Sequence, residues 1–65
     1  MLMRLKESSG EPVLVNSDRI TFVETFMEGS FVHLAGEEQA VKIAETPDEV
    51  LQAYIDQQIE QALAG

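Results

Sequence analysis

The stretch TPDEVLQAYIDQQIEQAL, residues 46–63, carries the clearest structural signal in this chain. It begins in the way that helices begin. The Thr46 hydroxyl can accept a hydrogen bond from the amide of Glu49, the Glu49 carboxylate can reach back, and Pro47 takes the first helical position, where no amide is needed. Acidic side chains in this turn also suit the positive end of the helix dipole. The stretch therefore predicts a C-terminal helix over residues 46–64.

Apolar side chains recur along this helix at spacings of three and four residues, which is the pattern of a helix with one buried side. The predicted buried stripe consists of Leu51, Tyr54, Ile55, Ile59, Ala62 and Leu63. Polar residues fill the other side. Such a stripe needs a surface to lie on, and residues 1–45 must supply it.

Residues 1–45 contain short segments rich in β-branched and aromatic residues, separated by turn signals such as Gly10, Gly29 and Gly36. They predict strands near residues 1–6, 12–15, 20–26, 31–34 and 39–44, of which the first two pair as a hairpin. The short polar side chains of residues 16–18 predict an Asx-type corner. The expected fold class is α+β, with one domain over 1–65. Residues 1–45 form a small antiparallel sheet of about five short strands, open or curled, and the C-terminal helix packs on it.

Three of these strands carry apolar side chains on both faces, at residues 13–15, 22–23 and 31–32. One helix covers only one face of a sheet, so either the sheet curls around its second face or that face meets a partner. A domain of this size buries only about 60% of its unfolded surface, which favours association with another copy. The predicted interface residues are Phe22, Val23, Phe31, Val32 and Tyr54.

The charge balance bears on the kind of partner. Twelve acidic residues stand against four basic ones, for a net charge of -8, and the basic residues are scattered. Direct binding to nucleic acid or to an anionic membrane surface is disfavoured, because both rely on clustered lysine and arginine. A protein with a basic surface remains a possible partner. The apolar runs are too short to span a bilayer, and the absence of cysteine is compatible with a reducing compartment, so we expect a soluble cytoplasmic protein.

Few residues are suited to catalysis or to metal binding. His33 is the only histidine. Its place between apolar neighbours on a predicted strand favours a surface position or a cross-strand pair over a general base, which needs a positioned partner. The acidic residues at 37–38 and within 45–49 lack the spacing of a calcium loop, and a turn and a helix cap explain them better. We therefore expect no enzyme, no cofactor and no metal site.

A pattern of turn glycines, apolar pairs and polar corner residues runs in order through most of the chain. Its members are Gly10, Val13 to Val15, Asn16, Asp18, Ile20, Val23, Glu24, Val32, Leu34, Gly36, Val41, Lys42, Asp48, Glu49 and Val50. The pattern resembles that of the small FlbD/SwrD-like proteins linked to bacterial flagella and swarming motility. The resemblance implies a β-rich domain with a C-terminal helix, an accessory role, and no catalytic residues.

Three functions remain open at this point. The first, which we expect, is a non-enzymatic protein–protein interaction module that self-associates and serves a bacterial assembly or regulator such as the flagellar system. The second is a small acidic inhibitor or nucleic-acid mimic, encoded for example by a phage, whose carboxylates occupy a basic protein groove. The third is a ligand-binding or catalytic domain, which requires a concave pocket with convergent polar groups.

Overall fold

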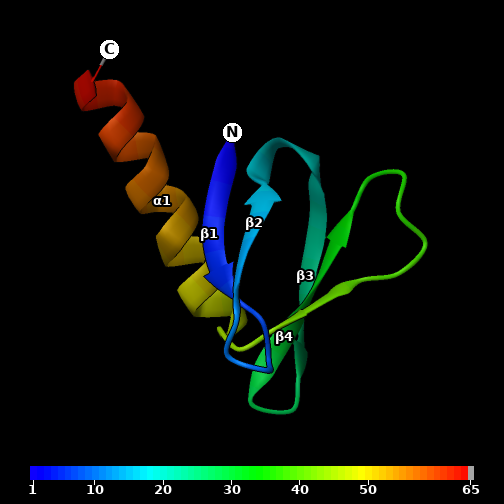
Figure 1. Ribbon diagram of the computed structural model, residues 1–65. Coiled ribbons are helices and arrows are strands. Elements are labelled where there is room, and N and C mark those ends of the chain that lie inside the picture. The colour runs from blue at the N-terminus through cyan, green and yellow to red at the C-terminus, as the bar shows by residue number, and fades with distance from the viewer. Residues whose placement is uncertain (65) are drawn as a thin grey trace.

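The computed structural model describes residues 1–64, which form five strands followed by one α-helix (Figure 1). The elements are β1 (Leu2–Lys6), β2 (Pro12–Asn16), β3 (Ile20–Phe26), β4 (Gly29–Leu34), β5 (Val41–Ile43) and α1 (Pro47–Ala64), with a 3-10 turn, Ser17–Arg19, between β2 and β3. The predicted α+β class, with about five short antiparallel strands and a C-terminal helix, is confirmed.

The strands are divided between two antiparallel sheets. β1 pairs with β2 as a hairpin, and β4 lies between β3 and β5 in the second sheet. The two sheets meet where β1 ends: a bridge joins Glu7 to Ile43, and the Ala44 amide donates to the Lys6 carbonyl oxygen at 2.7 Å. The strands therefore wrap around a shared interior without closing into a barrel.

The core lies between the two sheets and the helix. It consists of Met3, Leu5, Val15, Val32, Ile43 and Val50. Alternation along each strand turns every second side chain inward, so Met3 and Leu5 are buried while their neighbours on β1 are exposed. The same alternation places Val32, which is 0% exposed, inside and Phe31 on the outer face.

Both local signals in the sequence appear as predicted. The Glu49 amide donates to Thr46 Oγ1 at 3.2 Å, and the Thr46 amide donates to Glu49 Oε1 at 2.9 Å, which together form a capping box. At the corner after β2, the Asp18 amide donates to Asn16 Oδ1 at 3.1 Å. The predicted helix start and the predicted Asx-type corner are confirmed.

The predicted buried stripe of α1 is wrong. All six of its residues, Leu51, Tyr54, Ile55, Ile59, Ala62 and Leu63, are exposed. The side of α1 that packs on the sheets carries Val50, which is 4% exposed, with Ala53 and Gln57 half-buried. The helix therefore turns a different side toward the core than its larger apolar residues suggested.

The length of α1 explains part of this outcome. Its 18 residues span about 27 Å, whereas the five residues of β1, the strand beside it, span about 17 Å. The C-terminal end of α1 therefore projects past the N-terminal end of β1 (Figure 1). The difference between the two lengths is about 10 Å. Residues 58–64, which form this projection, are exposed all the way round.

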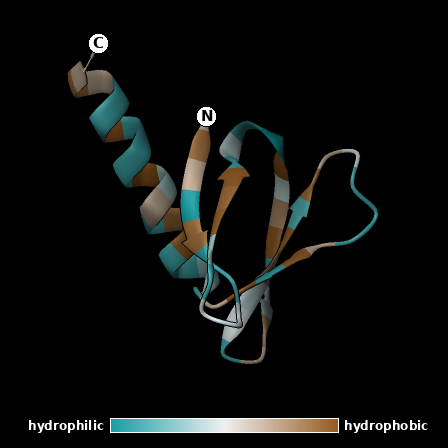
Figure 2. Cartoon of the chain, viewed as in Figure 1, coloured by the Kyte–Doolittle hydropathy of each residue, from teal (hydrophilic) through white to brown (hydrophobic). Residues whose placement is uncertain are grey.

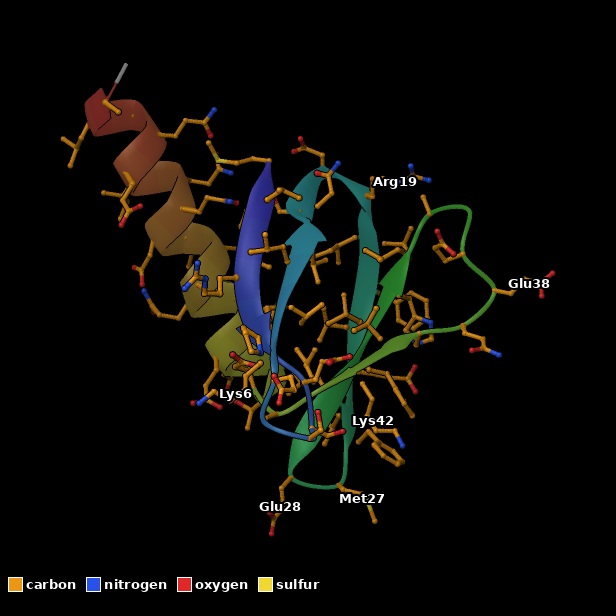
Figure 3. All side chains as sticks on the ribbon, viewed as in Figure 1. Lys6, Arg19, Met27, Glu28, Glu38 and Lys42 are labelled. Carbon is orange, nitrogen blue, oxygen red and sulfur yellow. The ribbon has the colours of Figure 1, made fainter. Side chains whose placement is uncertain are left out.

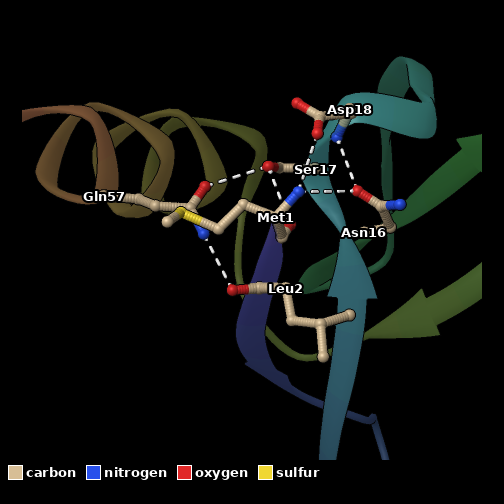
Figure 4. Close-up of polar contacts among 6 residues, drawn as sticks. All are labelled: Met1, Leu2, Asn16, Ser17, Asp18 and Gln57. Atoms are coloured by element: carbon tan, nitrogen blue, oxygen red, sulfur yellow. Dashed lines mark hydrogen bonds and ion pairs between the residues drawn. The ribbon is translucent and has the colours of Figure 1, made fainter. Parts of the chain in front are cut away.

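Gln57 fixes the helix to the β1–β2 hairpin just before the projecting part begins (Figure 4). Its Nε2 donates to the Leu2 carbonyl oxygen at 2.8 Å, and its Oε1 lies 2.9 Å from Ser17 Oγ. Ser17 Oγ also lies 3.0 Å from the Met1 carbonyl oxygen, and its single proton serves one acceptor at a time. A glutamine amide thus takes the place that an apolar side chain would fill in a longer helix–sheet contact.

Candidate interaction surfaces

One side of α1 carries a row of exposed apolar residues. We call it the exposed stripe, formed by Leu51, Tyr54, Ile55, Ile59, Ala62 and Leu63. The exposed fractions of its large members are 55% for Leu51, 40% for Tyr54, 41% for Ile55, 52% for Ile59 and 83% for Leu63. Figure 2 shows apolar positions recurring along α1 into its projecting part. Single exposed apolar residues are common, but a contiguous row of them marks an interaction surface.

The charged residues of α1 leave most of this stripe uncharged. Successive residues turn about 100° around a helix axis, so Glu49, Asp56 and Glu60 lie more than about 100° from the middle of the stripe. Asp48 belongs to the first turn at its N-terminal end. The helix contains no lysine or arginine. Uncharged glutamines lie within the angular range of the stripe, whereas Asp56 borders it one turn before Ile59.

An open groove of about 410 Å³ lies between α1 and β3 and is continuous with the exposed stripe. Leu51 and Tyr54 lie on its helix wall together with the acidic Asp48, and Ile20 and Val23 lie on the strand side. Both strand residues are half-buried. The groove is mainly apolar, so the N-terminal half of the exposed stripe borders a concave surface while the C-terminal half stands free in solvent.

A second candidate surface is the outer face of β3 and β4, where aromatic rings stand in a row. Phe22 lies opposite His33, and their rings stack with centroids 3.9 Å apart. Phe26 and Phe31 stack at 4.2 Å, and Phe31 meets His33 edge to face at 6.5 Å. Lys42, on the side of the sheet away from α1 (Figure 3), holds its Nζ 5.1 Å from the Phe26 ring centroid, within reach of a cation–π interaction. Much of the surface of these aromatic rings is therefore covered by contacts within the chain.

The environment of His33 argues against a catalytic role. The predicted cross-strand pair is confirmed by its stacking on Phe22. Its Nε2 is buried and makes no hydrogen bond within the described residues, although Glu24 Oε2 lies 3.3 Å away without the alignment that a hydrogen bond requires. A general base must come within about 3 Å of the proton that it abstracts, and the covered Nε2 is poorly placed for this, although 30% of the His33 side chain is exposed.

The five predicted interface residues lie in different places. Phe22 is 52% exposed and Phe31 half-buried, both on the outer aromatic face, and Tyr54 belongs to the exposed stripe. Val23 is half-buried beside the groove, and Val32 is in the core with no surface to offer a partner. An interface at the other four stays a prediction. Leu51, Ile55, Ile59 and Leu63 were predicted to lie in the core, so the sequence did not identify them as surface residues.

Two further properties concern the described part of the chain. Among residues 1–64, no three His, Asp or Glu side chains come together as a metal site would require. Across the same residues, α1 is too polar to cross a bilayer and no other helix is long enough.

Comparison of the chain with protein-family models, with curated proteins and with solved structures gave no match. Its function is therefore argued from the surfaces themselves.

Proposed function

We propose that this chain is a non-enzymatic protein–protein interaction module that self-associates through the exposed stripe of α1. The observation that carries the proposal is the row of five large apolar side chains, 40% to 83% exposed, on a helix that projects past its own sheet. Small domains gain stability by association, because their own cores bury a limited share of the chain. The exposed stripe of a second copy is a similar, largely apolar surface that can pack against it.

The energy available from this surface fits a weak, reversible complex. Burying one such side chain fully is worth about 1.5 to 3 kcal/mol, so side chains that are half exposed each contribute about 1 kcal/mol. Five from each copy give about 10 kcal/mol, against a cost of association of about 4 kcal/mol at the lower end of its range. The difference corresponds to a Kd on the order of tens of micromolar.

The wider role belongs to the same proposal. An accessory part in a bacterial assembly, such as the flagellar system, is supported by the resemblance of the turn, corner and helix-start residues to the FlbD/SwrD-like proteins. A cytoplasmic location is compatible with a chain that has no cysteine. The proposal involves no cofactor and no direct contact with nucleic acid.

The test is the solution mass of an Ile59→Glu variant, measured by sedimentation against the unaltered chain and an Ala64→Glu control. Ile59 lies in the exposed stripe, whereas Ala64, at about 100° per residue, falls on nearly the opposite side of α1. Both changes add one negative charge at an exposed position near the same end. We expect Ile59→Glu to lower the mass to that of a monomer and Ala64→Glu to leave the complex in place. If both variants keep the mass of the unaltered complex, the stripe is not the contact.

A second candidate function is supported by the net charge of -8. A small acidic protein of this kind can occupy a basic groove of another protein, and such binding weakens steeply with salt. This candidate predicts a chain that stays monomeric on its own and binds a basic protein only at low ionic strength. A salt-resistant self-complex with no affinity for basic proteins argues against it.

A further inference from the structure

The spacing of the exposed stripe defines how two copies can meet. Leu51 and Leu63 stand six residues to either side of position 57, and Ile55 and Ile59 stand two residues to either side of it. If a second helix runs in the opposite direction about this midpoint, Leu51 faces the partner's Leu63 and Ile55 faces the partner's Ile59. Each contact then occurs twice, as two-fold symmetry requires.

The groove beside α1 favours the same arrangement. Leu51 and Tyr54 lie on its helix wall, beside Asp48, near the N-terminal end of the stripe. Leu63, the most exposed of the large members at 83%, stands at the other end. Two antiparallel helices bring the projecting end of each copy over the groove of the other. Two parallel helices would leave both projecting ends together in solvent and both grooves uncovered.

Charge and dipole also distinguish the two directions. Asp48 and Glu49 lie in the first turn of α1, and its last turn has no basic residue. A parallel pair would place these four carboxylates side by side, where like charges repel. An antiparallel pair separates them by the length of the helix and aligns the two helix dipoles favourably.

The surface area of the chain leaves room for a partner. Its accessible surface is 4695 Å², whereas a folded monomer of 7.2 kDa is expected to expose about 4,100 Å². Its radius of gyration is 11.6 Å, against about 10.7 Å for a compact chain of this length. The excess of roughly 600 Å² approaches the 800 Å² or so that each partner contributes to an interface of standard size.

From these observations we infer that two copies of the chain form a symmetric dimer in which their α1 helices pack antiparallel, with the projecting end of each over the groove between α1 and β3 of the other. This inference rests on the proposed self-association and names its partner and geometry. In the dimer, the stripe side of the last two turns of α1 is buried against the other copy, while the opposite side stays exposed.

The test uses cysteine cross-linking, because the chain has no cysteine of its own. The variants Leu51→Cys and Leu63→Cys change exposed residues, and each is checked for a folded circular dichroism spectrum. A mixture of the two, under mild oxidation, is expected to give a disulfide-linked pair of one Leu51→Cys chain and one Leu63→Cys chain. Either variant alone is expected to form little disulfide-linked dimer. The same residue in the two antiparallel copies lies about 18 Å apart, whereas a disulfide needs Cα atoms within about 7 Å. Glu60→Cys, on the side of α1 away from the stripe, is the control that should not cross-link.

The alternative results separate this inference from the proposal on which it rests. Efficient linkage of Leu63→Cys to itself would mean parallel helices and would overturn the inference while leaving self-association intact. A dimeric mass with no linkage in the mixture would also overturn it, and would direct attention to the aromatic row on β3 and β4. A monomeric mass at all concentrations would overturn the inference and the proposed function together.

Discussion

The orientation of α1 predicts a large difference between two alanine substitutions on the same helix. Val50 is 4% exposed within the core, so Val50→Ala removes buried carbon at about 0.8 kcal/mol per group and leaves a cavity, for a total of about 2 to 3 kcal/mol. Ile55 is 41% exposed on the stripe. In a monomer, Ile55→Ala is expected to cost less than about 1 kcal/mol, because little core contact is lost and alanine is the better helix former.

Urea unfolding at two protein concentrations provides the assay, with the midpoint compared at constant slope. Well below the dimer Kd, Val50→Ala should lower the midpoint strongly and Ile55→Ala slightly. Well above the dimer Kd, association stabilises the unaltered chain. The difference in urea midpoint between the unaltered chain and Ile55→Ala should therefore be larger there than in dilute solution. If Ile55→Ala loses as much stability as Val50→Ala in dilute solution, the stripe is buried and the orientation of α1 described here is refuted.

Three further changes test single contacts. Gly29→Ala is expected to cost more than about 2 kcal/mol in urea unfolding, because the added Cβ would collide with the Ile43 carbonyl oxygen on the neighbouring strand, and an unchanged midpoint would contradict that close approach. Gln57→Ala should cost about 0.5 to 1.5 kcal/mol, the usual net contribution of a hydrogen bond, since it removes the donor to the Leu2 carbonyl oxygen, and a neutral result would show that water replaces the amide. Met27→Asn should raise the melting temperature by an amount equivalent to up to about 1 kcal/mol, because Met27 has φ 54°, which asparagine tolerates better; a lower melting temperature would mean that the Met27 side chain contributes more than its backbone strain costs.

The features that could be predicted from the sequence are those made by neighbouring residues. The Thr46–Glu49 capping box and the corner at Asn16 depend on side chains reaching amides two or three positions away, so residue type and spacing suffice to predict them. The β1–β2 hairpin needs little more than two short strands and a glycine turn. These contacts do not depend on how the remainder of the chain packs.

The side of α1 that packs could not be predicted in the same way. Its apolar residues occupy two sides, and the larger ones suggested the wrong side. The side that packs holds Val50, Ala53 and Gln57 at helical spacing, and the small Ala53 side chain allows the helix to lie close to the sheet. A glutamine in that row gives no hydrophobic signal because its side chain is polar. Its partners at Leu2 and Ser17 are more than thirty residues away in the chain, so the neighbouring sequence does not indicate them either.

The aromatic row required the strand register, which the sequence analysis left open by assigning residues 27–30 to the turn. The turn contains only Met27 and Glu28, because Phe26 already pairs with Gly29. From that pairing, Phe22 must lie opposite His33. Recognising a two-residue turn would have given the register and so predicted the stack of Phe22 on His33. Neither Met27 nor Glu28, however, is the glycine or asparagine that usually marks such a turn.

The most direct measurement is the solution mass by light scattering across a dilution series from about 1 mM to 10 µM, at low and at high salt. Each copy carries a net charge of -8, so salt should screen the repulsion between copies and leave the apolar contact in place. We expect a dimer at the high concentrations that dissociates on dilution and persists to lower concentrations in high salt. A monomer throughout the series at both salt concentrations would contradict it.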